Sequence, residues 1–429
     1  MRPPTLPSRS RIPIFGRPLR ITRLDNVTHT LVGALLGEAA SRTAPAIPDP
    51  GASIRRTLFM AVMIVGSNLP DSDLLYSLGS DDKLAYLLEH RGHTHTVIGA
   101  LAGSVVLLVL CAIWQRLRGT SLSVRDWTRL GALALLAPLL HVAMDALNTY
   151  GVHPWWPVDN RWLYGDSVFI VEPLFWASAA PLAFLLRSYV ARGLVVLALV
   201  VALYLALTTG LVMFGSIAVY CVVAVTMLAV GGLTRPNVAL CAAIGACLLV
   251  SGVFGLAHRQ AIARVDVETG AAFPGWTTLD RVLSPLPMNP LCWELILVQE
   301  DGDRYALRRA IASTVPSLQC PTLGGDRSIT APLRTVSVSD TPFVRWGGEI
   351  VESRERLRAL AATSCEVAAF LRFARTPWLS ESSQRRLIGD LRFDREPGLG
   401  FAELDLARPS SCPAYVPPWL PPRTDLLSR

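Results

Sequence analysis

The chain has 429 residues, of which 51% are hydrophobic and only 17% are charged, and its mean hydropathy is +0.40. This composition excludes an ordinary soluble multidomain protein and indicates an integral membrane protein, because long apolar runs need a lipid environment. The net charge of +7 does not form a basic face with interleaved aromatic side chains, so we expect no nucleic-acid partner.

Residues 1–24 hold six arginines and no acidic residue, and so carry nearly all of the excess positive charge. This segment resembles the charged start of a secretion signal, but no cleavage site follows it. One explanation keeps the segment in the cytoplasm, with a first apolar segment that enters the membrane without crossing it. The other is that residues 1–24 are a mis-assigned start and translation begins near Leu24. We favour the second explanation.

The apolar runs predict a mainly α-helical protein with a polytopic membrane domain at residues 25–258. Seven or eight spans are expected, because the first run is short and the second is interrupted by the sequence NLPDSD. The expected spans are residues 27–40, 57–78, 97–114, 130–147, 168–186, 193–214, 216–231 and 238–257.

Arginine in the short loops predicts the orientation of these spans. Arginines are found after the first, third, fifth and seventh expected spans, so these loops are expected in the cytoplasm. The opposite face then holds residues 80–96, residues 151–166 and everything after His258. We therefore expect a multi-pass membrane protein with an extracytoplasmic C-terminal domain.

Residues 259–429 are more polar and are expected to form a small α+β domain. The segments RVDVETGAAF, CWELILVQEDGDRYALRRA and TPFVRWGGEIVES predict strands, and ESRERLRALAATSCEVAAFLRFAR predicts an amphipathic helix. On an oxidising side of the membrane, the cysteines of this part would form two disulfides with unknown pairing. These cysteines are Cys292, Cys320, Cys365 and Cys412.

Histidines and aspartates gather where the expected topology gives a common membrane depth. Polar groups at that depth usually pair, bind an ion or line a wet cavity. Imidazole and carboxylate ligands together suit zinc, manganese or iron. We therefore predict a site for one or two divalent metal ions, with zinc as first choice and manganese or iron as alternatives. The predicted ligands are His29, Asp71, Asp73, His90, His95, His141 and Asp145.

The spacings leave alternatives open. His141 and Asp145 are four residues apart, so on a helix they share a face and can chelate one ion, or simply pack as a polar pair. Asp71 and Asp73 share a face only in an extended segment, and helix N-capping explains them equally well.

The sequence HRGHTHT places three histidines around Gly92, which permits a tight turn. A solvated polar loop is the alternative, although it does not explain the repeated choice of histidine. Arg91 would bind a phosphate or carboxylate group, or form a structural salt bridge.

Several other polar residues near the same face have weaker signals. His153 and Asp159 flank a tryptophan-rich loop and are expected at the membrane interface. Asp166 and Glu172 start the fifth expected span and would orient histidine ligands. His258 is expected to be incidental.

Five motifs in order resemble the YdjM-like family of inner-membrane proteins, which are regarded as metal-dependent hydrolases. They are LDNVTHTLVGALLGEA, NLPDSD, HRGHTHT, HVAMDALNTYGVHPWWP and YGDSVFIVEP, and the later SPLPMNPLCWELI also resembles that family. The resemblance implies that His90 and His95 are required and that His93 stands at a variable position. It also implies a location in the bacterial inner membrane and a start at the Asp-Asn pair, here Asp25.

The residues and the resemblance together predict a membrane-embedded, metal-dependent hydrolase. The metal would activate water, Asp73 or Asp166 would act as base, and Arg91 or Arg161 would hold an anionic group. The depth of the site suggests a lipid or lipid-linked ester or phosphodiester as substrate, and protein partners are unknown.

Two alternatives have no catalysis. A transporter or metal-binding membrane protein would also place ionisable groups inside spans, but the last three expected spans have no charged residue or histidine in their interiors. A structural or regulatory membrane protein leaves the histidines unexplained. The sequence has no Gly-x-Ser-x-Gly motif and no P-loop, which argues against a serine hydrolase or a nucleotide-driven enzyme.

Overall fold

A computed structural model describes residues 25–42, 52–75, 83–270, 272–321, 330–381, 385–394, 399–407 and 412–428. The basic segment at residues 1–24 lies outside the described residues.

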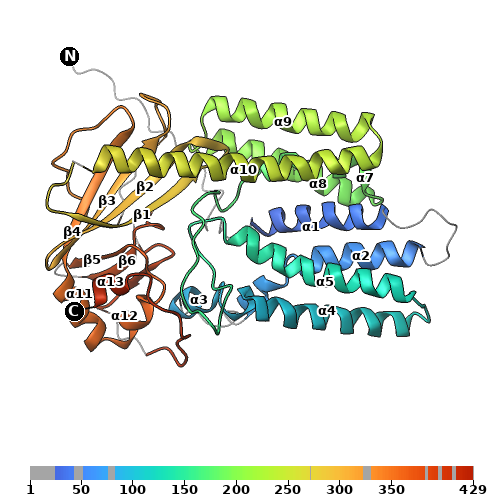
Figure 1. Ribbon diagram of the computed structural model, residues 1–429, viewed down its shortest axis with the longest axis horizontal. Helices are drawn as coiled ribbons and strands as arrows, with labels where there is room; N and C mark the ends of the chain where they lie inside the picture. Colours follow the sequence, from blue (N-terminus) through green and yellow to red (C-terminus); the bar gives the residue numbers. More distant parts are fainter. Residues whose placement is uncertain are drawn as a thin grey trace, which may run out of the picture.

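A helical bundle lies beside a smaller part that contains two β-sheets (Figure 1). One half of the bundle contains α1 (Asp25–Arg42), α2 (Ala52–Gly66), α4 (Val97–Leu117) and α5 (Val124–Asp145). The other half contains α8 (Tyr189–Thr208), α9 (Phe214–Leu233) and α10 (Pro236–Thr269), and the short helices α6 (Pro173–Ser178) and α7 (Leu182–Leu185) pack against them. Three short elements, η2 (Pro70–Leu75), α3 (Lys83–Glu89) and η3 (His93–His95), connect α2 to α4.

Five of the described helices are long and apolar enough to cross a membrane: α4, α5, α8, α9 and α10. Their outer faces expose large apolar side chains, among them Val105, Leu197 and Leu248. Such a surface is stable in lipid and not in water. The protein is therefore mainly helical and fits a membrane, although α1 and α2 do not meet the length and hydropathy of the other five.

The predicted fifth span, residues 168–186, is wrong as a continuous helix. This segment forms only α6 and α7, and every residue of α6 is buried inside the protein. Two prolines explain the break. Pro173 occupies the first turn of α6 and Pro181 precedes α7, positions that proline tolerates because its nitrogen has no hydrogen to donate.

The helices begin where a side chain can cap them. Thr96, Ser123 and Ser188 each accept a hydrogen bond from a backbone amide three residues later, at the starts of α4, α5 and α8. These hydroxyls replace partners that the first turn of a helix lacks.

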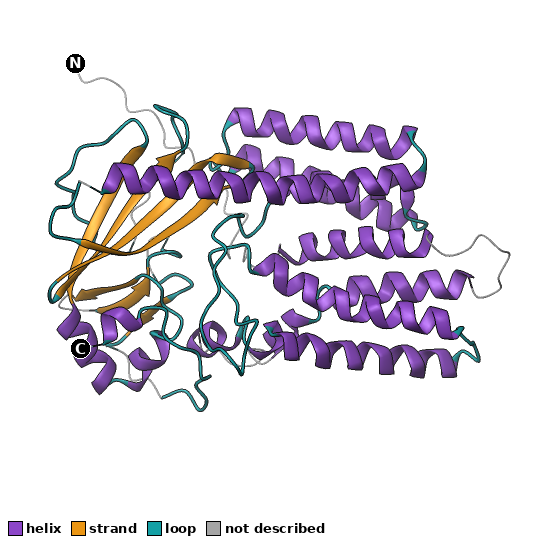
Figure 2. Ribbon diagram, in the orientation of Figure 1, coloured by secondary structure: helices purple, strands orange, loops and turns teal. Residues whose placement is uncertain are grey.

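The C-terminal part is built on antiparallel strands (Figure 2). A four-stranded sheet in the order β1–β2–β3–β4 contains β1 (Thr277–Leu286), β2 (Asn289–Asp301), β3 (Arg304–Ser313) and β4 (Val344–Ser353). A three-stranded sheet contains β5 (Pro377–Glu381), β6 (Arg386–Asp390) and β7 (Glu403–Asp405), and the helices are α11 (Arg354–Thr363), α12 (Cys365–Phe370) and α13 (Thr424–Leu427).

The predicted strands at β2, β3 and β4 are confirmed, but the prediction of a strand at RVDVETGAAF is wrong. Residues up to Thr269 continue α10. Ala257, Ala261 and Val265 recur every four residues, and they are buried against the first sheet. The alternation of polar and apolar residues favoured a strand, but the burial of one residue in every four favours a helix, and the helix forms. Figure 1 shows α10 continuing from the bundle to lie alongside this sheet.

The predicted amphipathic helix at residues 352–375 is two helices, α11 and α12, that meet at Ser364. Ser364 ends α11 and begins α12, because its hydroxyl accepts a hydrogen bond from the amide of Val367. Serine competes with continued helix in this way.

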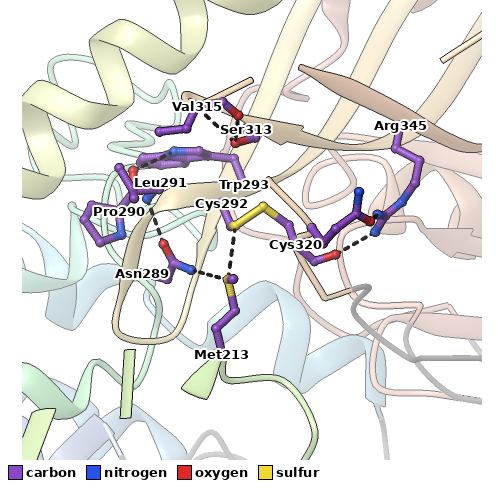
Figure 3. Close-up of a disulfide and its surroundings, with 11 residues drawn as sticks. Met213, Asn289, Pro290, Leu291, Cys292, Trp293, Ser313, Val315, Cys320 and Arg345 are labelled. Atoms are coloured by element: carbon purple, nitrogen blue, oxygen red, sulfur yellow. Dashed lines mark hydrogen bonds between the residues drawn. A yellow bond between two sulfur atoms is a disulfide. The ribbon is translucent and has the colours of Figure 1, made fainter. Parts of the chain in front are cut away.

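Two disulfides join the four C-terminal cysteines, Cys292 to Cys320 and Cys365 to Cys412. Figure 3 shows the first beside Met213, which lies at the turn between α8 and α9. The sulfur of Met213 accepts a hydrogen bond of 3.1 Å from the Asn289 side chain and lies 3.7 Å from the Cys292 sulfur. The end of the β1–β2 hairpin therefore rests on the end of the helical bundle.

Candidate metal centre

Separate segments of the chain bring ionisable groups together at one end of the bundle. The start of α1, η2, the residues around η3 and the end of α5 each supply at least one. Within the described residues, one ligand atom each from Asp71, His95, His141 and Asp145 lie within 4.8 Å of one another. All four residues are buried.

The position of α5 depends on a proline one turn before His141. Pro138 cannot donate to the carbonyl of Ala134, so that group needs another partner inside the membrane. The hydroxyl of Ser104 on α4 supplies it at 2.9 Å. This bond ties α4 to α5 just before α5 delivers its two ligands.

Glycines allow the neighbouring helices to approach closely. A side chain at Gly66 of α2 would meet the Cβ of Ala137 on α5 at 2.7 Å, and one at Gly33 of α1 would meet the Ser67 hydroxyl at 2.6 Å. Because the backbones lie this near, Nδ1 of His141 reaches the carbonyl of Ser67 at 2.7 Å. Nδ1 is therefore the donor, and Nε2 of His141 carries a lone pair.

His95 is oriented from its other side by Asp73. Nδ1 of His95 lies 3.2 Å from Oδ2 of Asp73, which also accepts hydrogen bonds from the Arg91 amide at 2.8 Å and the Thr94 hydroxyl at 3.1 Å. A carboxylate in this position fixes the proton on Nδ1 and leaves Nε2 free to bind a cation.

Two imidazole nitrogens and two carboxylate oxygens then converge. The Nε2 atoms of His95 and His141 are 3.1 Å apart. Oδ1 of Asp71 lies 3.3 Å and 3.5 Å from them, and Oδ2 of Asp145 lies 3.3 Å and 3.4 Å from them. Four lone-pair atoms this close repel one another unless a proton or a cation lies between them. The arrangement can therefore hold a metal ion.

A second group continues from the first. Asp25, His29 and Asp145 also supply ligand atoms within 4.8 Å of one another. Nε2 of His29 lies 3.3 Å from Oδ1 of Asp145, and the His29 ring stacks on His141 with centroids 3.9 Å apart. A third such group contains Asp71, Asp73 and His90, in which Nδ1 of His90 lies 3.2 Å from Oδ1 of Asp73.

Arg91 is enclosed by this site. Its guanidinium lies 3.0 Å from Asp145 and 3.3 Å from Asp25, and it donates to the side chain of Asn148 at 2.8 Å. The group also lies over the ring of Tyr150. Arg91 has a positive φ of 60°, which the bond from its amide to Asp73 stabilises. Its side chain is thus committed to protein carboxylates.

The charges of the site do not balance. Four carboxylates, those of Asp25, Asp71, Asp73 and Asp145, are buried with Arg91 as the permanent cation among them. Burial by itself would raise the pKa of Asp71, but contact with His141 and His95 holds that pKa well below its usual range. Asp71 therefore stays ionised at neutral pH, and its carboxylate is available to a cation.

Asp166 and Arg161, predicted as base and anion holder, lie in other surroundings. Asp166 is buried in an ion pair with Arg375 at 2.8 Å, and burial raises its pKa to about 6 against the opposing charge of Arg375. Arg161 is exposed and pairs with Asp159. Neither belongs to the groups of possible metal ligands found among the described residues.

The other histidines pack against aromatic rings. His153 is buried between Trp162 and Trp419, and burial lowers its pKa to about 3, so it is neutral. His93 contacts Trp156 and Trp419. The C-terminal part covers His153, and its placement at the membrane interface stays a prediction.

Glu172 lines a small cavity beside the second group. Its two oxygens accept hydrogen bonds from the amides of Leu174 and Met288, and burial raises its pKa to about 7. The cavity has a volume of about 20 Å³ and is also lined by Asp25, His29 and Asp145.

Asp25 is a member of the site that the sequence did not single out. The signal was present, since Asp25 and His29 are four residues apart on α1, the same spacing as His141 and Asp145 on α5. At the start of a helix, however, an aspartate is usually explained as a cap.

Comparisons with known proteins agree with the motifs. The family described as YdjM inner membrane protein matches residues 24–256, more than half of the chain. The uncharacterized protein YfhP of Bacillus subtilis (strain 168) is 26% identical over 155 residues, which cover 36% of this chain and 44% of that protein. The chain thus spans less than half the length of this relative. No solved structure matches the chain.

Proposed function

This chain belongs to the YdjM inner membrane protein family, and we propose that it is a membrane-embedded, metal-dependent hydrolase. The observation that carries the proposal is the convergence of Asp71, His95, His141 and Asp145 on one buried point. A divalent ion held there would lower the pKa of a bound water from about 15.7 towards 7 and so supply a nucleophile at neutral pH.

The spacing of the ligand atoms favours zinc. Ligands at about 2.0–2.1 Å from a tetrahedral ion are about 3.3–3.4 Å from one another. The five contacts between imidazole nitrogens and carboxylate oxygens or each other range from 3.1 to 3.5 Å. Manganese and iron remain alternatives, since the same ligand types bind them.

In metal-dependent hydrolysis Asp73 would act either as the base or as the partner that orients His95. The contacts support the second role. Both of its oxygens already face histidines or donors. Asp166 would have to leave Arg375 before it could act as base. Arg91 would attract an anionic substrate only at a distance, because its guanidinium is already paired with Asp25 and Asp145.

The proposed substrate is a lipid or lipid-linked ester or phosphodiester. The ligands lie where α5 ends and α4 is about to begin, so the site is at the depth of the headgroups if these helices cross the membrane. Two disulfides in the neighbouring C-terminal part support an oxidising, extracytoplasmic side for this end.

The test is metal analysis of the detergent-purified protein, followed by a hydrolysis screen. His95→Ala and His141→Ala are expected to lose the metal and any activity on phospholipids or bis(p-nitrophenyl) phosphate. His93→Ala is the matched control, because His93 lies in the same loop but packs against Trp156 and Trp419.

Two outcomes would contradict the proposal in different ways. A metal content equal to that of wild type in both His95→Ala and His141→Ala would refute the site. Metal that is lost in these variants, from a wild-type protein that hydrolyses none of the substrates, would favour a metal-binding protein or transporter without catalysis.

A further inference from the structure

We infer that the site holds a second divalent cation, bound by Asp25, His29 and Asp145, with Asp145 bridging the two ions. This inference rests on the proposed metal centre. It adds Asp25 to the ligands and assigns separate tasks to the two positions.

Asp145 is oriented as a bridge. Its Oδ2 faces His95 and His141 at 3.3 Å and 3.4 Å. Its Oδ1 faces the other way, 3.3 Å from Nε2 of His29 and 3.0 Å from the guanidinium of Arg91. A carboxylate whose two oxygens point at two separate sets of ligands is the arrangement by which paired ions are joined.

An unpaired polar atom marks the second position. Oδ1 of Asp25 is buried and has no hydrogen-bond partner in the described part of the chain. Asp25 and His29 are only 5% and 3% exposed. Unsatisfied groups at this depth are costly, so they indicate a ligand that supplies the missing contact.

The cavity of about 20 Å³ is lined by the same three residues, Asp25, His29 and Asp145. This volume fits one water or an ion with little else, since a single water needs about 10–15 Å³. Its remaining wall contains Thr28, Asn148 and Glu172, with apolar side chains beyond them.

Charge supports two ions rather than one. One divalent ion and Arg91 together leave one of the four buried carboxylates uncompensated. A second divalent ion reverses the balance and leaves one excess positive charge, which suits an anionic substrate such as a phosphodiester. Arg91 contacts Oδ2 of Asp25 and Oδ1 of Asp145, so it leaves Oδ1 of Asp25 available, and a carboxylate oxygen such as Oδ1 of Asp145 has a further lone pair for an ion.

The two positions differ in how completely protein surrounds them. The first has four protein ligands, so an ion there can bind water only by expanding to five ligands. The second has three, which is the number typical of catalytic ions that keep a place for water or substrate. The exchangeable position is therefore expected at Asp25 and His29, beside the cavity.

The experiment loads the full-length, detergent-solubilised protein with Mn²⁺ and measures both stoichiometry and electron paramagnetic resonance. Wild type is expected to bind two ions per chain and to give the spectrum of an exchange-coupled pair. Asp25→Asn and His29→Gln are expected to bind one ion with an uncoupled six-line spectrum. Asp159→Asn is the control and should match wild type, because Asp159 is a half-buried aspartate that pairs with Arg161 outside the site.

The outcomes separate this inference from the proposed function. If wild type and Asp25→Asn both bind one uncoupled ion, the second position is refuted while the first stands. If wild type binds no ion, the metal centre itself is refuted. If Asp25→Asn fails to fold, the stoichiometry and coupling of wild type alone decide between one ion and two.

Discussion

At the scale of single residues, the site depends on where two protons are held. Ser67 keeps the His141 proton on Nδ1 through its carbonyl, and Asp73 does the same for His95 through its carboxylate. Both Nε2 atoms consequently present lone pairs to the same point. A backbone carbonyl cannot be mutated, so Asp73 is the residue through which this arrangement can be tested.

Asp73→Asn is expected to weaken metal binding by about 10–100-fold while leaving the four ligands of the first position in place. The asparagine NH₂ group can face Nδ1 of His95 as a donor, which moves the ring proton to Nε2 and removes the lone pair. Competition with a chelating dye measures the affinity. Asp159→Asn serves as control, and an affinity equal to that of wild type in Asp73→Asn would rule out this role.

The residues of the site were predictable where spacing is local. His141 and Asp145 share a helix face, and the structure brings both to the cluster with Asp71 and His95. The sequence could not predict that Arg91 is consumed by internal ion pairs, because its partners come from α1 and α5, far along the chain. Long-range pairing of this kind leaves no periodic signal.

At the scale of elements, a C-terminal strap, residues 412–428, covers the segments that carry the histidines. Trp419 of the strap is fully buried, donates to the carbonyl of Leu88 at 3.0 Å and stacks on His153 at 3.9 Å. The strap is anchored by the disulfide from Cys412 to Cys365 in α12. The loop of the predicted site is thus held from outside the bundle.

Cys412→Ser is expected to lower the stability of the folded protein by about 3–4 kcal/mol, because the disulfide closes a loop between cysteines 47 residues apart. Thermal unfolding in detergent should shift to lower temperature, and a reductant, which also breaks the bond from Cys292 to Cys320, should lower the melting temperature of wild type at least as far. Cys241→Ser, which removes an exposed free cysteine, should melt like wild type. Equal melting temperatures for all three proteins would show that the strap is not held by this bond.

The long helices could be predicted from their apolar composition, but the segment interrupted by prolines could not. The long helices α4, α5, α8, α9 and α10 lie on predicted spans, since each needs only its own composition to be recognised. Residues 168–186 look equally apolar, but Pro173 and Pro181 and the packing of α6 inside the protein make them short helices. The pairing of the cysteines and the position of Trp419 depend on tertiary contacts that no local pattern encodes.

At the scale of the whole molecule, the candidate metal centre and the disulfide-bonded part lie at the same end of the bundle. α10 connects them, since its residues Ala257, Ala261 and Val265 pack on the sheet while its earlier part belongs to the bundle. The arginines between α4 and α5 lie at the other end. Once the side of the membrane that either end of the bundle faces is known, the compartment of the metal centre is known too.

We expect the C-terminal part and the metal centre to face away from the cytoplasm, since arginine-rich short loops stay inside and disulfides form outside. The measurement is labelling of intact cells with a membrane-impermeant thiol reagent, in a background whose free cysteines, Cys111, Cys221, Cys241 and Cys247, are replaced by alanine. Glu355→Cys on α11 and Ser121→Cys between α4 and α5 are both exposed positions. Glu355→Cys should be labelled in intact cells, whereas Ser121→Cys should react only after the membrane is permeabilised. The reverse pattern would put the site in the cytoplasm, where its substrate would have to come from the inner leaflet. Labelling of both positions in intact cells would mean that the end of α4 and the C-terminal part do not lie on opposite sides.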